Sequence, residues 1–249
     1  MKTRKALGGA SLTDFKPQLE RMERRLFLKQ GLSLGALTLL SGCTLKDDDA
    51  VDRLLWAMSR WNDRVQAALF NPDKLAPSYS EADVVTPFPF NAYYEEALAP
   101  VVDGTTYRLH LSGLVEDKRG WTLQELRALP QTTQITRLVC VEGWSAVGKW
   151  TGAPFRTFLE RIGADLTAKY VGFQCADKYW TSIDMPTALH PQTLLVLDFP
   201  ETKYGYPVRI RMPTKLGFKN PKFVTEIFVT NDNPGGYWEK QGYNWFSGT

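Results

Sequence analysis

The most regular hydrophobic pattern in the chain lies between residues 51 and 69. Apolar side chains recur there every three or four residues, which is typical of an amphipathic helix with one apolar face. The positions are Val51, Leu54, Leu55, Met58, Trp61, Val65 and Leu69. Aspartates at the start of this segment would lie near the positive end of the helix dipole. We expect the helix to pack its apolar face on the domain; the alternative is a surface for a partner.

The rest of the chain shows patterns typical of strands and of short helices. Apolar and polar residues alternate, or β-branched and apolar residues cluster, in six segments that predict strands: 107–112, 135–141, 170–174, 194–199, 208–212 and 223–230. Thr122 and Glu125 have capping-box spacing before a short helix. Pro154 suits the first turn of a helix through Ile162, and residues 187–191 predict a helical turn. We expect an α+β fold, with mixed β-sheets and flanking helices in a single domain.

Residues 1–42 have the features of an export signal. Residues 24–29, Arg-Arg-Leu-Phe-Leu-Lys, match the twin-arginine export pattern, and the apolar run 31–40 is too short for a membrane-spanning helix. The run ends in Leu-Ser-Gly-Cys, residues 40–43, which matches a lipoprotein cleavage box. We expect export to the periplasm and acylation of Cys43, which would anchor the mature chain to a lipid bilayer. The expected parts are a signal (1–42), a lipid-anchored linker with the amphipathic helix (43–80) and an oxidoreductase domain (81–249).

Removal of residues 1–42 changes the charge of the chain. The whole sequence has 30 Lys and Arg and 27 Asp and Glu, and the signal holds eight and three of these, which leaves 22 − 24 = −2. The basic character therefore belongs largely to the signal, and no basic patch argues for binding of nucleic acid. The sequence also contains no haem-attachment motif, dinucleotide-binding fingerprint, P-loop or cysteine cluster for an iron–sulfur centre.

Two cysteines remain beside Cys43, and Cys140 has the more informative surroundings. It ends the predicted strand 135–141, and the next segment is turn-prone and holds two tryptophans and three glycines. A thiolate there could be the single protein ligand of a soft metal. A small buried hydrophobe is the commoner role of a lone cysteine, and a Cys140–Cys175 disulfide is a further alternative in an oxidising compartment.

The segment 140–154 has the pattern C-V-E-x-W-S-x-V-x-x-W-T-G-x-P. It resembles the segment around the molybdenum-ligating cysteine in the sulfite-oxidase-like molybdopterin enzymes, and most closely the branch that contains the periplasmic protein-methionine-sulfoxide reductases. The resemblance extends from about Phe90 to about Tyr243. It implies the fold of that family and a molybdenum–molybdopterin cofactor with Cys140 as catalytic residue and only protein ligand to the metal.

The resemblance also implies which residues bind the cofactor. Residues 91–95 resemble an N-x-x-Y-E element, which places Asn91, Tyr94 and Glu95 against the pterin. Residues 204–209 resemble N-G-x-P-x-R, with tyrosine in place of the asparagine, and Arg209 would hold the phosphate through its planar fork. Residues 215–222 resemble K-x-G-F-K-x-x-K, so backbone donors around Asn220 and Pro221 and the Lys222 side chain would complete the site. Cys175 replaces a cofactor-contacting threonine, and could contact the cofactor or pair with Cys140.

The implied activity is oxygen-atom transfer. Reduction of sulfoxides such as methionine sulfoxide, free or in proteins, is favoured, because no basic anion pocket is evident beyond the arginine assigned to the phosphate. The alternatives are a sulfite-oxidising type of enzyme, or a metal-free lipoprotein binding module stapled by a Cys140–Cys175 disulfide. With one redox cofactor implied, electrons would come from a membrane haem or quinol-linked electron-transfer protein.

Overall fold

The computed structural model describes residues 49–199 and 201–249. The predicted export signal, with its paired arginines, and the predicted lipid site Cys43 lie outside these residues. Contacts divide the chain into two units, Met1–Leu55 and Trp56–Thr249. The second unit contains all the strands that the structure describes. The predicted boundary between residues 80 and 81 stays a prediction.

Helix α2 spans Asp49–Leu69, which confirms the predicted amphipathic helix. The prediction that this helix packs its apolar face on the domain is wrong. Met58 and Trp61 on the apolar face are 59% and 65% exposed. The helix instead uses polar side chains, because Asp63 Oδ1 accepts a hydrogen bond from the Phe246 amide (2.7 Å) and Gln66 Oε1 from the Gly248 amide (3.2 Å). Periodicity predicts that a face is apolar, but it does not predict what covers that face.

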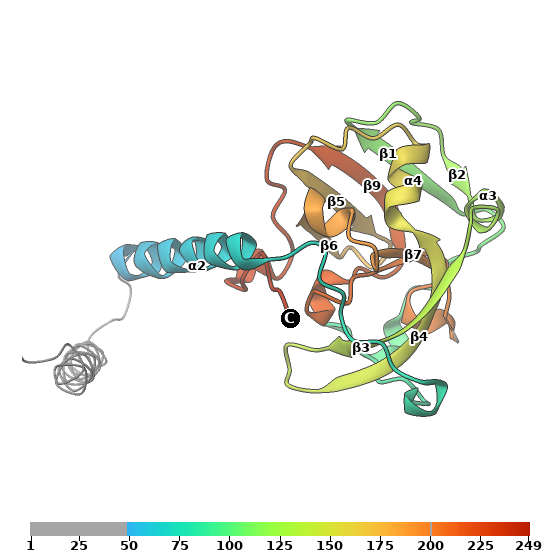
Figure 1. Cartoon of the computed structure of the whole chain (residues 1–249), viewed down its shortest axis with the longest axis horizontal. Coiled ribbons are helices and arrows are strands. Elements are labelled where there is room, and N and C mark those ends of the chain that lie inside the picture. The colour runs from blue at the N-terminus through green and yellow to red at the C-terminus, as the bar shows by residue number, and fades with distance from the viewer. Residues whose placement is uncertain (1–48, 200) are drawn as a thin grey trace, which may run out of the picture. The chain divides into compact units, whose positions relative to one another are not determined.

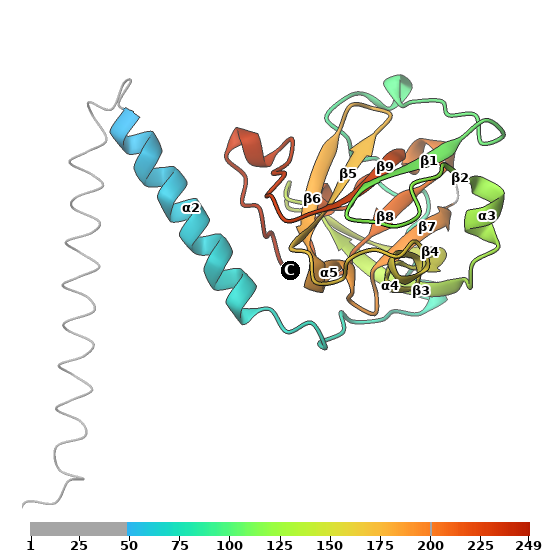
Figure 2. The same cartoon turned by 90° about the horizontal axis from the view of Figure 1, so that it is seen from above.

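The first sheet has five strands in the order β2-β1-β9-β5-β6. Strands β1 and β9 are parallel and the other neighbours are antiparallel, so this sheet is mixed. Its strands are β1 (Arg108–Gly113), β2 (Trp121–Thr122), β5 (Tyr170–Cys175), β6 (Trp180–Asp184) and β9 (Val224–Thr230). Figure 2 shows β5, β6 and β9 grouped in the domain, with helix α3 (Leu123–Arg127) at the opposite end.

The second sheet is antiparallel and has the order β3-β4-β7-β8. Its strands are β3 (Thr132–Val139), β4 (Ser145–Pro154), β7 (Leu194–Asp198) and β8 (Arg209–Arg211). The β3–β4 hairpin runs along one side of the domain (Figure 1). β4 corrects the prediction that the segment after Cys140 is a turn through residue 152, and β3 ends at Val139 rather than at 141.

The two sheets and helix α4 (Phe155–Arg161) enclose the main core. Phe155, Phe158 and Leu159 of α4 are fully buried against side chains of both sheets. A smaller cluster surrounds Trp150, whose ring stacks on Phe199 at 4.5 Å between centroids. The combination of a mixed sheet, an antiparallel sheet and packed helices confirms the predicted α+β class.

Short helices and turns connect the strands. The predicted capping box is present before α3, because the Glu125 amide donates to Thr122 Oγ1 (3.1 Å) and the Thr122 amide to Glu125 Oε2 (2.9 Å). Helix α5 spans Met185–Ala188, two residues earlier than predicted. The 3-10 turns are η1 (Glu81–Asp83), η2 (Glu96–Leu98), η3 (Thr202–Tyr204), η4 (Gly217–Lys219) and η5 (Glu239–Gln241). Within residues 49–199 and 201–249, no helix has both the length and the apolar character that a bilayer span requires.

Candidate active site

Cys140 begins the tight turn between β3 and β4. Its amide donates to the Trp144 carbonyl (2.8 Å), and the Gly143 amide donates back to the Cys140 carbonyl (3.2 Å). Gly143 has a φ of +91°, in the left-handed region that favours glycine, and this conformation allows the turn to close. The hairpin thereby places the cysteine directly after the end of β3.

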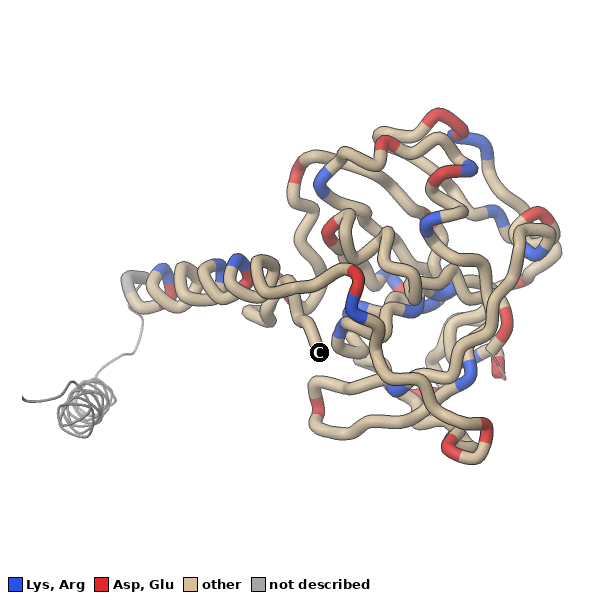
Figure 3. Tube along the Cα trace, viewed as in Figure 1, with Lys and Arg blue, Asp and Glu red and all other residues tan. Residues whose placement is uncertain are grey.

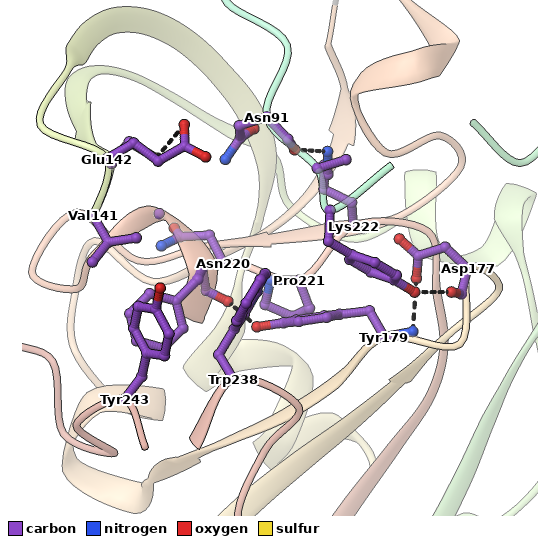
Figure 4. A pocket seen from close by; sticks show the side chains of 15 residues that line it. Asn91, Val141, Glu142, Asp177, Tyr179, Asn220, Pro221, Lys222, Trp238 and Tyr243 are labelled. Carbon is purple, nitrogen blue, oxygen red and sulfur yellow. Dashed lines mark hydrogen bonds between the residues drawn. The ribbon is translucent and has the colours of Figure 1, made fainter. Parts of the chain in front are cut away.

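The Cys140 side chain lines a pocket of about 690 Å³, including the part open to solvent. Loops from distant parts of the chain form its walls: Asn91, Ala92, Tyr93, Val141, Glu142, Asp177, Tyr179, Gly217, Phe218, Asn220, Pro221, Lys222, Trp238 and Tyr243. Figure 4 shows Val141 and Glu142 on one side, and Asp177 and Lys222 on the other. The structure therefore brings together five of the predicted site residues, which are Asn91, Cys140, Asn220, Pro221 and Lys222.

The Cys140 sulfur lies 3.7 Å from Glu142 Oε2, which also accepts a hydrogen bond from the Trp144 indole N–H (3.0 Å). Burial raises the pKa of the Cys140 thiol, and the neighbouring Glu142 carboxylate also raises it. The free side chain is thus a thiol, and a bound metal ion would have to displace its proton. No group of three His, Cys, Asp or Glu suited to a metal ion occurs in the described part of the chain. A metal at Cys140 would therefore need a further ligand that these residues do not provide.

The segment predicted to contact the pterin is only partly at the pocket. Asn91 lines the pocket. Tyr94 does not line it, but its hydroxyl donates a hydrogen bond to Oδ2 of the lining residue Asp177 (2.8 Å). Glu95 is exposed, does not line the pocket and forms the N-cap of η2. Its predicted contact therefore has no support in this geometry.

Asn220 and Pro221 line the pocket, but not as backbone donors. The Asn220 amide is already bonded to the Gly217 carbonyl (3.0 Å), and proline has no N–H. At these two positions the geometry gives no support for backbone donors, and the wider prediction of donors around them stays a prediction. Asn220 has a bracing function instead: its Oδ1 accepts from the Met212 amide (2.7 Å) and the Arg211 guanidinium (3.0 Å).

Lys222 and Arg209 are two buried cations near each other. Their side chains flank Gly205, where an added Cβ would lie 3.0 Å from Lys222 Cβ and 3.2 Å from Arg209 Cβ. Burial and the charge of Arg209 lower the pKa of Lys222 to about 7. The Lys222 ammonium donates to the Asn91 carbonyl, which joins two walls of the pocket. Figure 3 shows Lys and Arg positions in the interior of the domain, as well as on its surface.

Arg209 lies beside the pocket rather than in it. It lines a smaller cavity of about 210 Å³ next to β7 and β8, and its guanidinium stacks on Trp150 at 4.8 Å. One nitrogen donates to the Tyr204 carbonyl (2.7 Å), while the buried Nε has no partner among the described residues. Burial lowers the pKa of Arg209 to about 9.

These cations provide a test of whether the site suits a molybdopterin cofactor. Within the part of the chain that the structure describes, neither Arg209 nor Lys222 forms an ion pair with a carboxylate. Buried charges are costly unless they are paired, and both of these have donors that an anion could use. A phosphate is an anion that guanidinium and ammonium groups bind well. Lys222, in the same pocket as the Cys140 thiol, therefore fits a cofactor that carries a phosphate and a metal, and Arg209 adds a second buried cation beside that pocket.

Cys175 is the last residue of β5 and lies in the main core. It is free, as is Cys140, so the alternative of a Cys140–Cys175 disulfide is not found in this structure. Burial raises the pKa of the Cys175 thiol well above its usual range. Cys175 does not line the pocket, so its predicted cofactor contact has no support there.

The aromatic wall of the pocket was not predicted from the sequence. Tyr243 packs against Trp238 (5.2 Å between centroids) and Phe218 (5.7 Å), and Tyr93 stacks on Tyr237 (4.8 Å). Asp177 supports this wall from the β5–β6 turn by accepting hydrogen bonds from the Tyr94 hydroxyl and the Tyr179 amide. The density of aromatic residues in the C-terminal segment, 237–246, was the available signal.

Comparison with known proteins decides the family. Residues 96–238 match the family model described as "oxidoreductase molybdopterin binding domain". The chain belongs to this family. It is 58% identical to a putative protein-methionine-sulfoxide reductase subunit, YedZ1, of Azospira oryzae over 235 residues, which are 93% of this chain and 90% of that relative. It is 29% identical to the protein-methionine-sulfoxide reductase catalytic subunit MsrP of Ralstonia nicotianae, over 74% of this chain and 65% of that one.

A solved structure supports the fold. The sulfane dehydrogenase SoxCD of Paracoccus pantotrophus is similar with a TM-score of 0.50 at 20% identity, over 54% of this chain and 40% of that one. Membership of the family and this likeness confirm the predicted family, the sulfite-oxidase-like fold and a molybdopterin-binding oxidoreductase. The roles of the individual site residues stay predictions.

Proposed function

We propose that this protein is a molybdenum-dependent enzyme that reduces sulfoxides, with methionine sulfoxide in proteins as the favoured substrate class. The observation that carries the proposal is the position of Cys140. Its thiol lines a pocket whose walls hold aromatic rings and the buried cation Lys222. The methionine-sulfoxide reductase names of the Azospira and Ralstonia relatives support the same substrate class.

In this proposal Cys140 binds the metal as a thiolate, and Lys222 and Arg209 hold the phosphate of the pterin. When bound, the cofactor would supply the two-electron redox chemistry of oxygen-atom transfer. Tyr94 acts indirectly, because its hydrogen bond fixes Asp177 at the pocket wall. The hydrogen bond from the Lys222 ammonium to the Asn91 carbonyl fixes the position of the phosphate-binding cation relative to the wall that contains Asn91.

The reaction converts one sulfoxide, two electrons and two protons into one thioether and one water. Trp238, Tyr243 and Phe218 offer aromatic surface to the methyl group of the substrate and to the thioether of the product, a contact that thioether sulfur favours. Glu142 and Asp177 add carboxylates on opposite sides of the pocket (Figure 4). With Lys222 assigned to the phosphate of the cofactor, these carboxylates disfavour a second anion such as sulfite, whereas a sulfoxide is neutral. The pocket therefore favours sulfoxide reduction over sulfite oxidation.

The proposed setting is the cell envelope. The twin-arginine pattern at residues 24–25 would direct folded, cofactor-loaded protein to the periplasm, and acylated Cys43 would anchor it to a bilayer. A haem or quinol-linked membrane protein would then deliver the electrons. Lysine at both Arg24 and Arg25 is expected to leave the protein in the cytoplasm, as measured by cell fractionation. Normal accumulation of this variant in the periplasm would contradict the export route.

A direct assay tests the proposed reaction. Purified protein is supplied with reduced viologen dye and a methionine-sulfoxide peptide, and in a separate reaction with sulfite and an electron acceptor. We expect turnover of the peptide and at most trace oxidation of sulfite. Sulfite oxidation that exceeds sulfoxide reduction would overturn the proposed direction.

A further inference from the structure

Helix α2 leaves its apolar face without a partner among the described residues. Met58, Trp61 and Leu69 of this face are 59%, 65% and 79% exposed. The contacts of the helix with the C-terminal tail come from another side, where Asp63 and Gln66 accept hydrogen bonds from backbone amides. A helix that only braced the domain would bury its apolar side chains and expose its polar ones. In α2 most of the apolar side chains are exposed as well, so bracing of the domain does not account for this face.

The arginines of α2 gather on one flank of the helix, where Asp49, its first residue, lies about 40° from Arg53. With about 100° between successive residues, Arg53, Arg60 and Arg64 fall within one narrow sector beside the apolar face. Asp52 and Asp63 fall on the other flank, which is the side that meets the tail through Asp63. The free surface of α2 is therefore an apolar strip bordered by a row of arginines.

We propose that α2 lies in the interface of a lipid bilayer, with its apolar face toward the acyl chains and its arginines toward lipid phosphates. Leucine and tryptophan on one face and arginine beside it are the features of interfacial helices. In a protein–protein contact, three aligned arginines would need matching acids, whereas phosphate headgroups neutralise them without a specific partner. The inference concerns attachment and goes beyond the proposed reaction.

The position of the helix in the chain supports a bilayer as the occupant. Asp49 follows the predicted lipid site Cys43 by six residues, which can span at most about 20 Å. A lipid at Cys43 would therefore keep α2 close to the membrane surface. An acyl anchor and an interfacial helix would then act as two adjacent membrane signals, and such pairs bind more stably than one signal.

The test uses the chain from residue 43 onward, the form that export is proposed to produce, with Cys43→Ala so that no lipid is attached. Binding to vesicles of phosphatidylethanolamine and phosphatidylglycerol is measured by flotation. One variant carries Leu54→Gln, Met58→Gln and Trp61→Gln. A matched control carries Leu98→Gln, Val101→Gln and Leu114→Gln, which are exposed apolar residues outside the helix. Glutamine preserves helix formation, and circular dichroism checks the helix content of both variants.

We expect the parent and the control to float with the vesicles, and the α2 variant to bind at least about tenfold more weakly. A parent chain that does not bind vesicles would overturn the proposal. So would a parent that binds native membranes but not pure lipid, because the occupant would then be a membrane protein. A parent that is dimeric in light scattering, with the α2 variant monomeric and no lipid binding, would assign the face to a second copy. None of these outcomes depends on the cofactor or on turnover, so they are independent of the proposed reaction.

Discussion

The buried ion pair between Lys219 and Glu239 joins the two segments that form the aromatic side of the pocket. Lys219 Nζ donates to Glu239 Oε1, and the two side chains are 1% and 6% exposed. Thr181 Oγ1 donates to the same carboxylate oxygen (3.1 Å). Lys219 directly follows Phe218, and Glu239 directly follows Trp238, so the pair holds both pocket residues in place. We predict that Glu239→Gln destabilises the domain and loosens the pocket.

The size of the expected stability loss in Glu239→Gln follows from the burial of the ion pair. Removing one member of a buried ion pair usually costs about 3–5 kcal/mol, because the other charge stays buried without compensation. Burial already lowers the pKa of Lys219, so the variant can release part of that cost by losing the lysine proton. We therefore expect a loss of about 3 kcal/mol of unfolding free energy at neutral pH. With urea slopes of about 1–3 kcal/mol/M, the unfolding midpoint should fall by about 1–3 M.

The assay is urea unfolding followed by tryptophan fluorescence, together with KM for a methionine-sulfoxide peptide. The exposed pair Lys149–Glu81 provides the control, because its side chains are 48% and 67% exposed and Glu81→Gln should cost less than about 1 kcal/mol. The double variant Lys219→Met, Glu239→Leu removes both charges and should recover most of the lost stability. If Glu239→Gln unfolds at the same urea concentration as the parent, or if the double variant is less stable than the single one, the buried pair does not stabilise the domain in this way.

Four further predictions concern the cofactor, pH, substrate and attachment. Arg209→Lys keeps the charge but loses the planar fork, so less molybdopterin should remain bound after gel filtration; unchanged occupancy would remove Arg209 from the phosphate site. Burial lowers the pKa of Lys222 from 10.5 to about 7, so between pH 7 and pH 10.5 the unfolded chain binds more protons than the folded one. The unfolding free energy of cofactor-free protein should therefore rise with pH across this range. Lys222→Met should reduce that slope, and an unchanged slope would assign it elsewhere, for example to Lys215, whose pKa burial also lowers to about 7. Trp238→Ala should raise KM for the sulfoxide peptide more than it lowers kcat, and a pure kcat effect would argue against substrate contact. Cys43→Ala enzyme, exported with a substitute signal, should keep its dye-linked activity and lose much of its rate with native membranes as the electron source. The reason is that tethering raises the effective concentration of enzyme at the membrane to roughly millimolar. Equal membrane-driven rates for the tethered and untethered enzyme would show that the lipid has another purpose.

Local signals in the sequence predicted several elements of the structure. The three- and four-residue spacing predicted α2, and the Thr122–Glu125 spacing predicted the start of α3. The strand leading to Cys140 and the pocket position of Lys222 were also predicted. In each of these cases the information lies within a few neighbouring residues, or in a segment that resembles a known family.

The rest depended on contacts between distant residues. Strand β4 was not predicted because its glycines are typical of turns, although its tryptophan is typical of strands. In the fold, Gly152 allows the Leu195 carbonyl to approach, where an added Cβ would lie 2.1 Å from the oxygen. The aromatic wall depends on the C-terminal segment folding back onto loops at residues 91–93 and 217–222, which no local pattern indicates. The same limit applies to α2, whose apolar face was predicted correctly and its packing wrongly.

The central claim is that Cys140 anchors a molybdenum cofactor in this pocket, and one comparison tests it most directly. Cys140→Ala and Cys175→Ala proteins are prepared from a molybdenum-replete host that supports twin-arginine export, and their dye-linked reduction of a methionine-sulfoxide peptide is measured with their molybdenum content. We expect Cys175→Ala to stay active and to contain molybdenum, and Cys140→Ala to be folded without turnover. Full activity in Cys140→Ala, or parent protein without molybdenum, would show that Cys140 does not anchor the cofactor.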